Sequence, residues 1–268
     1  MQKIDMQMIG WRWARRFVLL AALAVLGGTA LAQDKGCAVV VLHGKWGNPQ
    51  SLGFFGRQLE SVCTAQAIEM PWSRRRGYDQ PYAVALGDIA QQVKALRAQG
   101  YRRVLLAGHS MGANAALAYM AEVGDVEGVI ALAPGHAPES SYRRGIGKDA
   151  VDQARELVAA GKGDEMLSME DLNMGQRRSM RMSAQVLLSY FDPQGLGNMP
   201  ASAARFKKPV PLLWVAGTQD PLNTGGPEPV FSHAPAHPAS QYLVVQADHM
   251  GTPDVAAPQV LAWIKALP

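Results

Sequence analysis

Residues 104–120 have the sequence VLLAGHSMGANAALAYM, and this stretch decides the fold. A short apolar run, typical of a buried strand, leads into Gly108–Gly112, which has the form Gly-x-Ser-x-Gly, and a run of small residues typical of a helix follows. In such a turn the central Ser110 takes a strained backbone conformation, and the glycines let strand and helix approach closely. The Ser110 hydroxyl is then exposed at a helix N-terminus, where backbone N–H groups face a developing negative charge. The alternative is an ordinary strand–turn–helix unit in which the serine is only an N-cap.

A histidine and an aspartate in the C-terminal part of the chain supply the partners that a reactive serine requires. A serine hydroxyl is a poor nucleophile until a base takes its proton, and the usual base is a histidine that a carboxylate orients. His249 follows the last expected strand, and Asp220 lies in the loop after the apolar run 212–216, in the order this architecture uses. The alternatives are a surface-loop histidine and a turn aspartate. Asp248, adjacent to the base, and Asp192, within an expected insertion, are rival acids.

Backbone N–H groups near the serine are candidates for an oxyanion hole, the set of donors that stabilises a negatively charged oxygen. One belongs to Met111, directly after the serine, and the second to Lys45, in the loop 42–47 after the first expected strand. The His-Gly pair in this loop lets the chain bend so that the Lys45 N–H points into the site, and the Lys45 side chain need not take part. We expect His43 to brace the loop by hydrogen bonds and His109 to point away from a substrate.

The rest of the chain alternates strand and helix patterns, which is typical of an α/β fold with a parallel sheet covered by helices on both faces. Continuous apolar runs, expected where both faces of a strand are buried, predict strands at 38–42, 67–70, 103–107, 128–133, 210–216 and 241–245. Helical patterns of this alternating part cover 51–65, 82–98, 111–122 and 254–266.

The alternation breaks between residues 135 and 208. This segment has no strong strand pattern, and its helical patterns lie near 149–160 and 183–191, so we predict a helical cap inserted into the sheet domain. Six of the 13 methionines occur in it: Met166, Met169, Met174, Met180, Met182 and Met199. They either line an adaptable apolar pocket or fill gaps in a small core.

Residues 1–32 have the features of a secretory signal peptide. Basic residues precede an apolar run at 17–26, and Ala30-Leu31-Ala32 is a small-residue cleavage site. The alternative is an uncleaved membrane anchor, but the run is short for a bilayer span and glycines interrupt it. The pair Arg15-Arg16 leaves both the general secretory and the twin-arginine routes open. We predict cleavage after the last of these alanines, a mature domain at 33–268 without a stable membrane anchor, and a periplasmic or secreted location.

The charge balance gives no reason to expect a nucleic-acid partner. The chain carries 26 lysines and arginines against 22 aspartates and glutamates. The expected leader holds four of the basic residues and one of the acidic ones, so the remainder has a net charge of +1. The residues after the leader are enough for one sizeable core with an inserted cap.

The chain has two cysteines, Cys37 at the start of the first expected strand and Cys63 near the end of the helix that follows it. In an exported protein an even number of cysteines suggests a disulfide. Because that helix returns antiparallel to the strand, both residues are expected at the same edge of the sheet. We therefore predict a Cys37–Cys63 bridge, with two buried free thiols as the alternative.

Taken together, His43-Gly44, the turn at 108–112, Asp220 and His249 resemble the alpha/beta-hydrolase superfamily over residues 39–267. The resemblance implies a mostly parallel, eight-stranded sheet, an active site above the carboxyl ends of the strands, and neither a cofactor nor a metal. Only a few residues separate the expected cleavage point from the first strand, so the usual antiparallel opening hairpin is missing and we expect about six strands. The serine of the turn departs from haloalkane dehalogenases and epoxide hydrolases, which carry aspartate there.

The resemblance also implies an activity. The expected function is a serine hydrolase that cleaves a carboxylic ester or thioester of a small molecule through an acyl-enzyme, with Ser110 as nucleophile, His249 as base and Asp220 orienting the base. The alternatives are a serine peptidase acting on small peptides and a non-catalytic binding protein on the same fold. The motifs are specific for the fold and the catalytic groups, and not for the substrate.

Five residues are candidates for substrate binding. Arg74, Arg75 and Arg76 follow the second expected strand, at the carboxyl edge of the sheet, and can engage a carboxylate or phosphate. They are otherwise a solvated basic loop or salt-bridge partners for acids of the cap. Trp46 lies in the loop with the expected oxyanion donor, and His136 lies at the root of the cap, where it either hydrogen-bonds substrate or holds the cap hinge.

Overall fold

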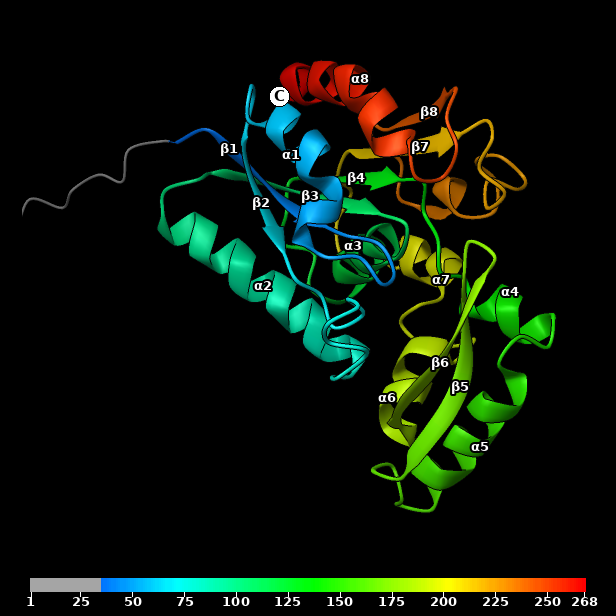
Figure 1. Cartoon of the computed structure of the whole chain (residues 1–268). Helices are drawn as coiled ribbons and strands as arrows, with labels where there is room; N and C mark the ends of the chain where they lie inside the picture. The colour runs from blue at the N-terminus through cyan, green and yellow to red at the C-terminus, as the bar shows by residue number, and fades with distance from the viewer. Residues whose placement is uncertain (1–34) are drawn as a thin grey trace, which may run out of the picture. The chain divides into compact units, whose positions relative to one another are not determined.

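Six strands form one parallel sheet in the strand order β2-β1-β3-β4-β7-β8 (Figure 1). The computed structural model describes residues 35–268, and the expected signal peptide lies outside the described residues. The strands are β1 (Cys37–Leu42), β2 (Thr64–Ile68), β3 (Arg103–His109), β4 (Gly128–Leu132), β7 (Leu212–Gly217) and β8 (Gln241–Val245). Every neighbouring pair is parallel, which confirms the predicted sheet.

The chain enters this sheet at β1 and adds strands on both sides of it. β1 pairs with β2 on one side and with β3 on the other, and Leu42 at the end of β1 lies opposite Gly108 in β3. In open parallel sheets a crevice for ligands forms at the carboxyl ends of the strands where the order reverses. The loops after β1 and β3 therefore meet at such a position.

Helices cover both faces of the sheet because successive strand residues point to opposite sides. Within β1, Val39 and Val41 pack in the layer of α1 and α8, and Val40 and Leu42 pack in the layer of α2 and α3. These helices are α1 (Gly53–Leu59), α2 (Tyr82–Ala98), α3 (Met111–Glu122) and α8 (Thr252–Ala266). None of the helices in the described chain is both long and apolar enough to cross a membrane.

The helix expected at 51–65 is shorter in the structure. A 3-10 turn, η1 (Pro49–Leu52), precedes α1, and β2 begins at Thr64 where a strand was expected from residue 67. Asn48 caps the 3-10 turn and Pro49 begins it, so the helical segment starts early. β2 is only partly buried, and it lacks the continuous apolar run that indicates a fully buried strand.

The segment 135–208 contains the expected helices and also an antiparallel hairpin, which corrects the expectation of a purely helical cap (Figure 1). Its elements are α4 (Pro138–Arg143), α5 (Lys148–Ala159), β5 (Met166–Asn173), β6 (Gln176–Ser183), α6 (Ala184–Phe191) and α7 (Met199–Ala204). β5 alternates exposed and buried residues, and one buried position is Asp171, so no apolar run indicated a strand. Met174 and Gly175, both with positive φ, form the two-residue turn that such hairpins favour. A second 3-10 turn, η2 (Phe231–His233), lies between β7 and β8.

A disulfide joins Cys37 to Cys63, with 4.9 Å between their Cα atoms. Cys37 is the first residue of β1 and Cys63 immediately precedes β2, and the next residues of the two strands pair directly. The predicted bridge is confirmed. It lies at the amino ends of the strands, away from the edge that carries the serine.

Candidate active site

Ser110 occupies the sharp turn between β3 and α3, with φ 54° and ψ −117°. The flanking glycines are required by space, since a Cβ added at Gly108 would lie 2.2 Å from the carbonyl carbon of Gly112. One added at Gly112 would lie 2.2 Å from the carbonyl oxygen of Leu42. The Ser110 N–H donates to the carbonyl of Leu132 in the neighbouring strand at 3.0 Å. These contacts hold a left-handed backbone that a serine adopts only when its surroundings determine it.

His249 and Asp220 form a buried pair at the same edge of the sheet. The imidazole Nδ1–H donates to Asp220 Oδ2 at 2.8 Å, and each side chain is about 2% exposed. Asp220 Oδ1 accepts from the N–H of Leu222 at 2.8 Å, which fixes the carboxylate. The Nε2 atom of His249 is buried and has no hydrogen-bond partner within residues 35–268. In the neutral form of the imidazole, this geometry places the proton on Nδ1 and the lone pair on Nε2.

Gly135 lies between the serine and the histidine. A Cβ added there would lie 2.7 Å from Ser110 Oγ and 3.6 Å from His249 Cε1. Ser110 and His249 also line one small cavity of about 70 Å³. The structure thus brings together the three predicted residues, and only glycine at 135 leaves space beside the hydroxyl.

The loop after β1 lies directly against the serine turn. A Cβ added at Gly44 would lie 3.1 Å from the Ser110 Cβ. Met111 is the first residue of α3, and the first N–H groups of a helix have no partner within the helix. Lys45 lines both cavities that Ser110 lines. The two expected oxyanion donors are therefore on the two segments that flank the hydroxyl.

His43 braces this loop as expected. Its Nε2 accepts from the N–H of Met70 at 3.1 Å, and its Nδ1–H donates to the carbonyl of Gly44 at 2.8 Å. The Trp72 indole donates to the His43 carbonyl at 2.9 Å. Burial lowers the pKa of His43, so the ring is neutral and can both donate and accept.

His109 has a role that the sequence did not indicate. Its Nε2–H donates to the backbone carbonyl of His249 at 2.9 Å, and the two rings are 4.9 Å apart. Burial and the nearby His249 lower the pKa of His109 to about 4. A neutral His109 therefore holds the loop that carries the candidate base.

Asp171, also missed by the sequence analysis, binds the loop after β1 from the hairpin. It accepts hydrogen bonds from Lys45 Nζ at 2.7 Å, from the Trp46 indole at 3.1 Å and from the Tyr78 hydroxyl at 2.8 Å. Burial, followed by the charge of Asp171, raises the pKa of Tyr78, so its hydroxyl stays a donor. In the sequence, Asp171 continues an every-second-residue pattern that begins with Leu167 and Met169. This pattern is only a weak signal that the carboxylate is buried.

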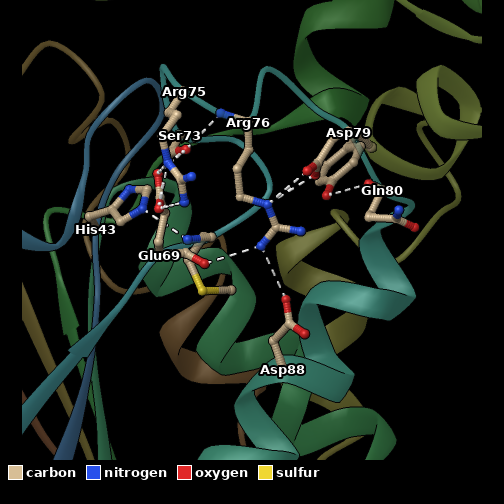
Figure 2. Close-up of polar contacts among 10 residues, drawn as sticks. His43, Glu69, Ser73, Arg75, Arg76, Asp79, Gln80 and Asp88 are labelled. Atoms are coloured by element: carbon tan, nitrogen blue, oxygen red, sulfur yellow. Dashed lines mark hydrogen bonds and ion pairs between the residues drawn. The ribbon is translucent and has the colours of Figure 1, made fainter.

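Two of the three arginines after β2, Arg75 and Arg76, pair with acids of their own neighbourhood (Figure 2). Arg75 binds Glu69, and this hydrogen-bonded pair lowers the pKa of Glu69 to about 2. Arg76 binds Asp79 at 3.0 Å and Asp88 at 3.3 Å. Their partners are thus not the acids of the cap.

The structure does not bring every substrate-binding candidate to the serine. Arg74, Arg75 and Arg76 are not among the described lining residues of the two cavities at Ser110. Arg74 borders a separate, open pocket. Trp46 is also outside both linings, and its indole is used by Asp171. His136 does line the larger cavity, with its Nε2–H donated to the Tyr190 carbonyl at 2.9 Å.

The larger cavity has a volume of about 610 Å³ and extends from Ser110 into the inserted segment. Its walls combine residues of the sheet loops with apolar residues of the insertion, among them Met169, Met174, Met199 and Phe191. Three of the six methionines therefore line this space, and Met182 is a buried core residue. Both expectations for the methionines hold in part.

Comparisons with known proteins agree with this architecture. The model of the alpha/beta hydrolase family matches residues 11–262, and the chain belongs to that family. No curated protein matches it. Among solved structures, a carboxyl esterase from Bacillus coagulans has a TM-score of 0.62 at 15% identity, covering 87% of this chain and 90% of its own. A monoacylglycerol lipase from Paleococcus ferrophilus has a TM-score of 0.60 at 19% identity, covering 85% of this chain and 93% of its own. At these identities the likeness shows the fold.

Proposed function

We propose that this protein is a serine hydrolase that cleaves a carboxylic ester or thioester through an acyl-enzyme. One observation carries the proposal: His249 is oriented by a buried carboxylate on one side and has an unpartnered, buried nitrogen on the other, next to a serine in a strained turn. A binding protein has no need of this arrangement. The names of the similar structures, an esterase and a lipase, support an ester bond as the target.

The proposed reaction has two halves. Ser110 Oγ attacks the carbonyl carbon while His249 Nε2 takes the hydroxyl proton, and Asp220 stabilises the imidazolium that forms. The N–H groups of Met111 and Lys45 stabilise the negative oxygen. His249 then gives the proton to the departing alcohol or thiol, which leaves the acyl group on Ser110. A water, deprotonated by His249, attacks the acyl-enzyme, and the carboxylic acid leaves as the proton returns to Oγ.

The larger cavity suggests where the substrate lies. A space of about 610 Å³ with both apolar and polar walls accommodates one extended arm of an ester beside the hydroxyl. Arg75 and Arg76 are paired with Glu69, Asp79 and Asp88, so neither is proposed to bind the substrate.

The protein acts outside the cytoplasm in this proposal. The signal-peptide pattern of residues 1–32 and a disulfide between its two cysteines both fit an oxidising compartment. Mass spectrometry of protein exported by cells that express the full chain should give a mature form that begins at residue 33. Export with the leader intact would contradict the predicted cleavage.

The test of the catalytic proposal is covalent labelling. A fluorophosphonate should modify the wild-type protein once, on the peptide that contains Ser110, and hydrolysis of p-nitrophenyl esters should stop. Ser110→Ala should abolish both, whereas Ser61→Ala, which changes an exposed serine of the loop after α1, should leave both unchanged. A folded protein without label on Ser110 would favour a binding function.

A substrate panel then separates the bond types. p-Nitrophenyl esters and acyl thioesters should be hydrolysed at least about a hundredfold faster, in kcat/KM, than aminoacyl p-nitroanilides. The reverse order would make the protein a peptidase with the same catalytic groups.

A further inference from the structure

We infer that Asp171 is a positioning residue, which makes the inserted hairpin a working part of the oxyanion hole. The inference rests on the proposed function, because it concerns the loop that carries the Lys45 N–H. It assigns a role to a carboxylate that lies outside the Ser110–His249–Asp220 relay.

Asp171 binds two separate loops of the sheet domain at once. Its three donors are Lys45 and Trp46 from the loop after β1 and Tyr78 from the loop after β2. The side chain is 2% exposed and borders the larger cavity, and these three donors are its hydrogen-bond partners. A buried carboxylate that loses such donors is left with an uncompensated charge, and the donors lose their fixed positions.

The neighbours of Asp171 in β5 hold the same residue of the loop. The Leu172 carbonyl accepts from Lys45 Nζ at 3.1 Å, and the Asn173 amide donates to the Lys45 carbonyl at 3.2 Å. Three consecutive residues of the hairpin therefore fix both the side chain and the backbone carbonyl of Lys45. The peptide plane next to the expected oxyanion donor cannot rotate while these bonds persist.

The loop also needs this support because its backbone is strained. Trp46 has φ 57°, in the left-handed region that a bulky residue rarely occupies. Such a conformation persists only when the surroundings determine it. Here the Trp46 N–H donates to the Trp72 carbonyl at 2.9 Å, and the Trp46 indole donates to Asp171. Without the carboxylate, the loop loses one of these two anchors and relaxes away from Ser110.

Kinetics of Asp171→Asn give the direct test. Loss of an interaction that matters only in the transition state lowers kcat and leaves KM nearly unchanged. We expect kcat for a p-nitrophenyl ester to fall about tenfold to a hundredfold with KM within about threefold of the wild type. Affinity for a trifluoromethyl ketone, which forms an oxyanion on the serine, should fall by the same factor as kcat/KM. Glu170→Gln, an exposed neighbour in β5, should change none of these values.

Tyr78→Phe provides a second test, and this variant, unlike Asp171→Asn, removes no buried charge. Tyr78 is outside the described linings of both cavities at Ser110, and its hydroxyl donates to Asp171. We expect a smaller fall in kcat, about threefold to tenfold, with KM unchanged. Unchanged kcat in both folded variants, or a rise in KM alone, would overturn the positioning role.

A double-mutant cycle tests whether Asp171 acts through Lys45. If Asp171 acts through Lys45, then Lys45→Met combined with Asp171→Asn should cost much less than the product of the single effects on kcat. Fully multiplicative effects would contradict the coupling. Labelling of wild-type Ser110 by a fluorophosphonate tests the proposed function separately. If the wild type is labelled and active but the Asp171 variants have unchanged kinetics, only the inference about Asp171 is contradicted.

Discussion

Single atoms decide whether the candidate site can work. The free lone pair on His249 Nε2 depends on the buried Asp220, and space beside Ser110 Oγ depends on the absence of a side chain at Gly135. Neither condition is visible in a motif of five residues. The next two predictions concern this scale.

Gly135→Ala should inactivate the protein without unfolding it. The new methyl group would lie 2.7 Å from Ser110 Oγ, so the hydroxyl must move. A displacement of this size costs about a hundredfold in kcat/KM, whereas the melting temperature should stay within about 3 °C. Gly87→Ala, in α2 with open space around it, should leave kcat/KM unchanged and raise the melting temperature slightly, because alanine favours the helix. Full activity of Gly135→Ala would mean that the attacking atom is elsewhere.

His109 should make the protein less stable in acid. Its pKa is about 4 in the folded protein against 6.5 for the free side chain, so the unfolded state binds more protons between these values. The contribution to stability is fully present above pH 6.5 and is lost as the pH falls toward 4. His136, whose pKa burial and the charge of Lys45 lower to about 3, acts in the same direction.

Urea unfolding at several pH values measures this effect. Between pH 7 and pH 4.5 the wild type should lose about 2 kcal/mol more of its unfolding free energy than His109→Gln. The exposed His233→Gln should follow the wild-type curve. Parallel curves for the wild type and His109→Gln would show that His109 is not the acid-sensitive group.

At the scale of elements, the central contact joins α3 to the inserted segment. Asn114, one turn after Ser110, donates from its amide to the carbonyls of His136 and Gly197, each at 2.7 Å. The Tyr82 hydroxyl of α2 donates to the Asn114 amide oxygen. One buried side chain thus connects α3, α2 and both ends of the insertion.

Asn114→Ala should destabilise the protein by about 3 kcal/mol, since three buried polar partners lose their hydrogen bonds together. Tyr82→Phe, which removes one of these bonds, should cost only about 1 kcal/mol. Urea unfolding monitored by circular dichroism gives both values. Equal costs for the two variants would show that the insertion is not held through Asn114.

On the scale of the whole molecule, the disulfide and the site lie at opposite edges of the sheet. The bridge joins two residues 26 positions apart at the amino ends of β1 and β2, while Ser110 follows the carboxyl end of β3. Stability and catalysis should therefore respond separately to its loss.

Removal of the bridge by Cys37→Ser with Cys63→Ser should lower the unfolding free energy by about 3 kcal/mol. The kcat of the folded variant should equal that of the wild type. Dithiothreitol should shift the urea midpoint of the wild type and leave that of the double variant unchanged. A wild-type midpoint that does not respond to the reductant would contradict the bridge.

Much of this protein follows from local sequence. The helices at 82–98 and 111–122 and the strand at 241–245 have the predicted bounds, because periodicity and glycine placement are properties of neighbouring residues. The candidates Ser110, Asp220 and His249 could be selected because chain order and loop position suffice to choose them. The assignment of their catalytic roles stays a prediction until labelling is done.

Only the tertiary structure decided what surrounds those residues. The hairpin β5–β6 is stabilised by pairing between strands and by burial of Asp171 against two distant loops, and neither has a local apolar signature. The support of His249 by His109 spans 140 positions of the chain, and the Asp171 contact with Lys45 spans 126. Local periodicity determined the helices and strands, whereas folding decided which groups the buried polar side chains bind. Burial of a polar group is unfavourable unless it is hydrogen-bonded, and here the partners come from distant parts of the chain.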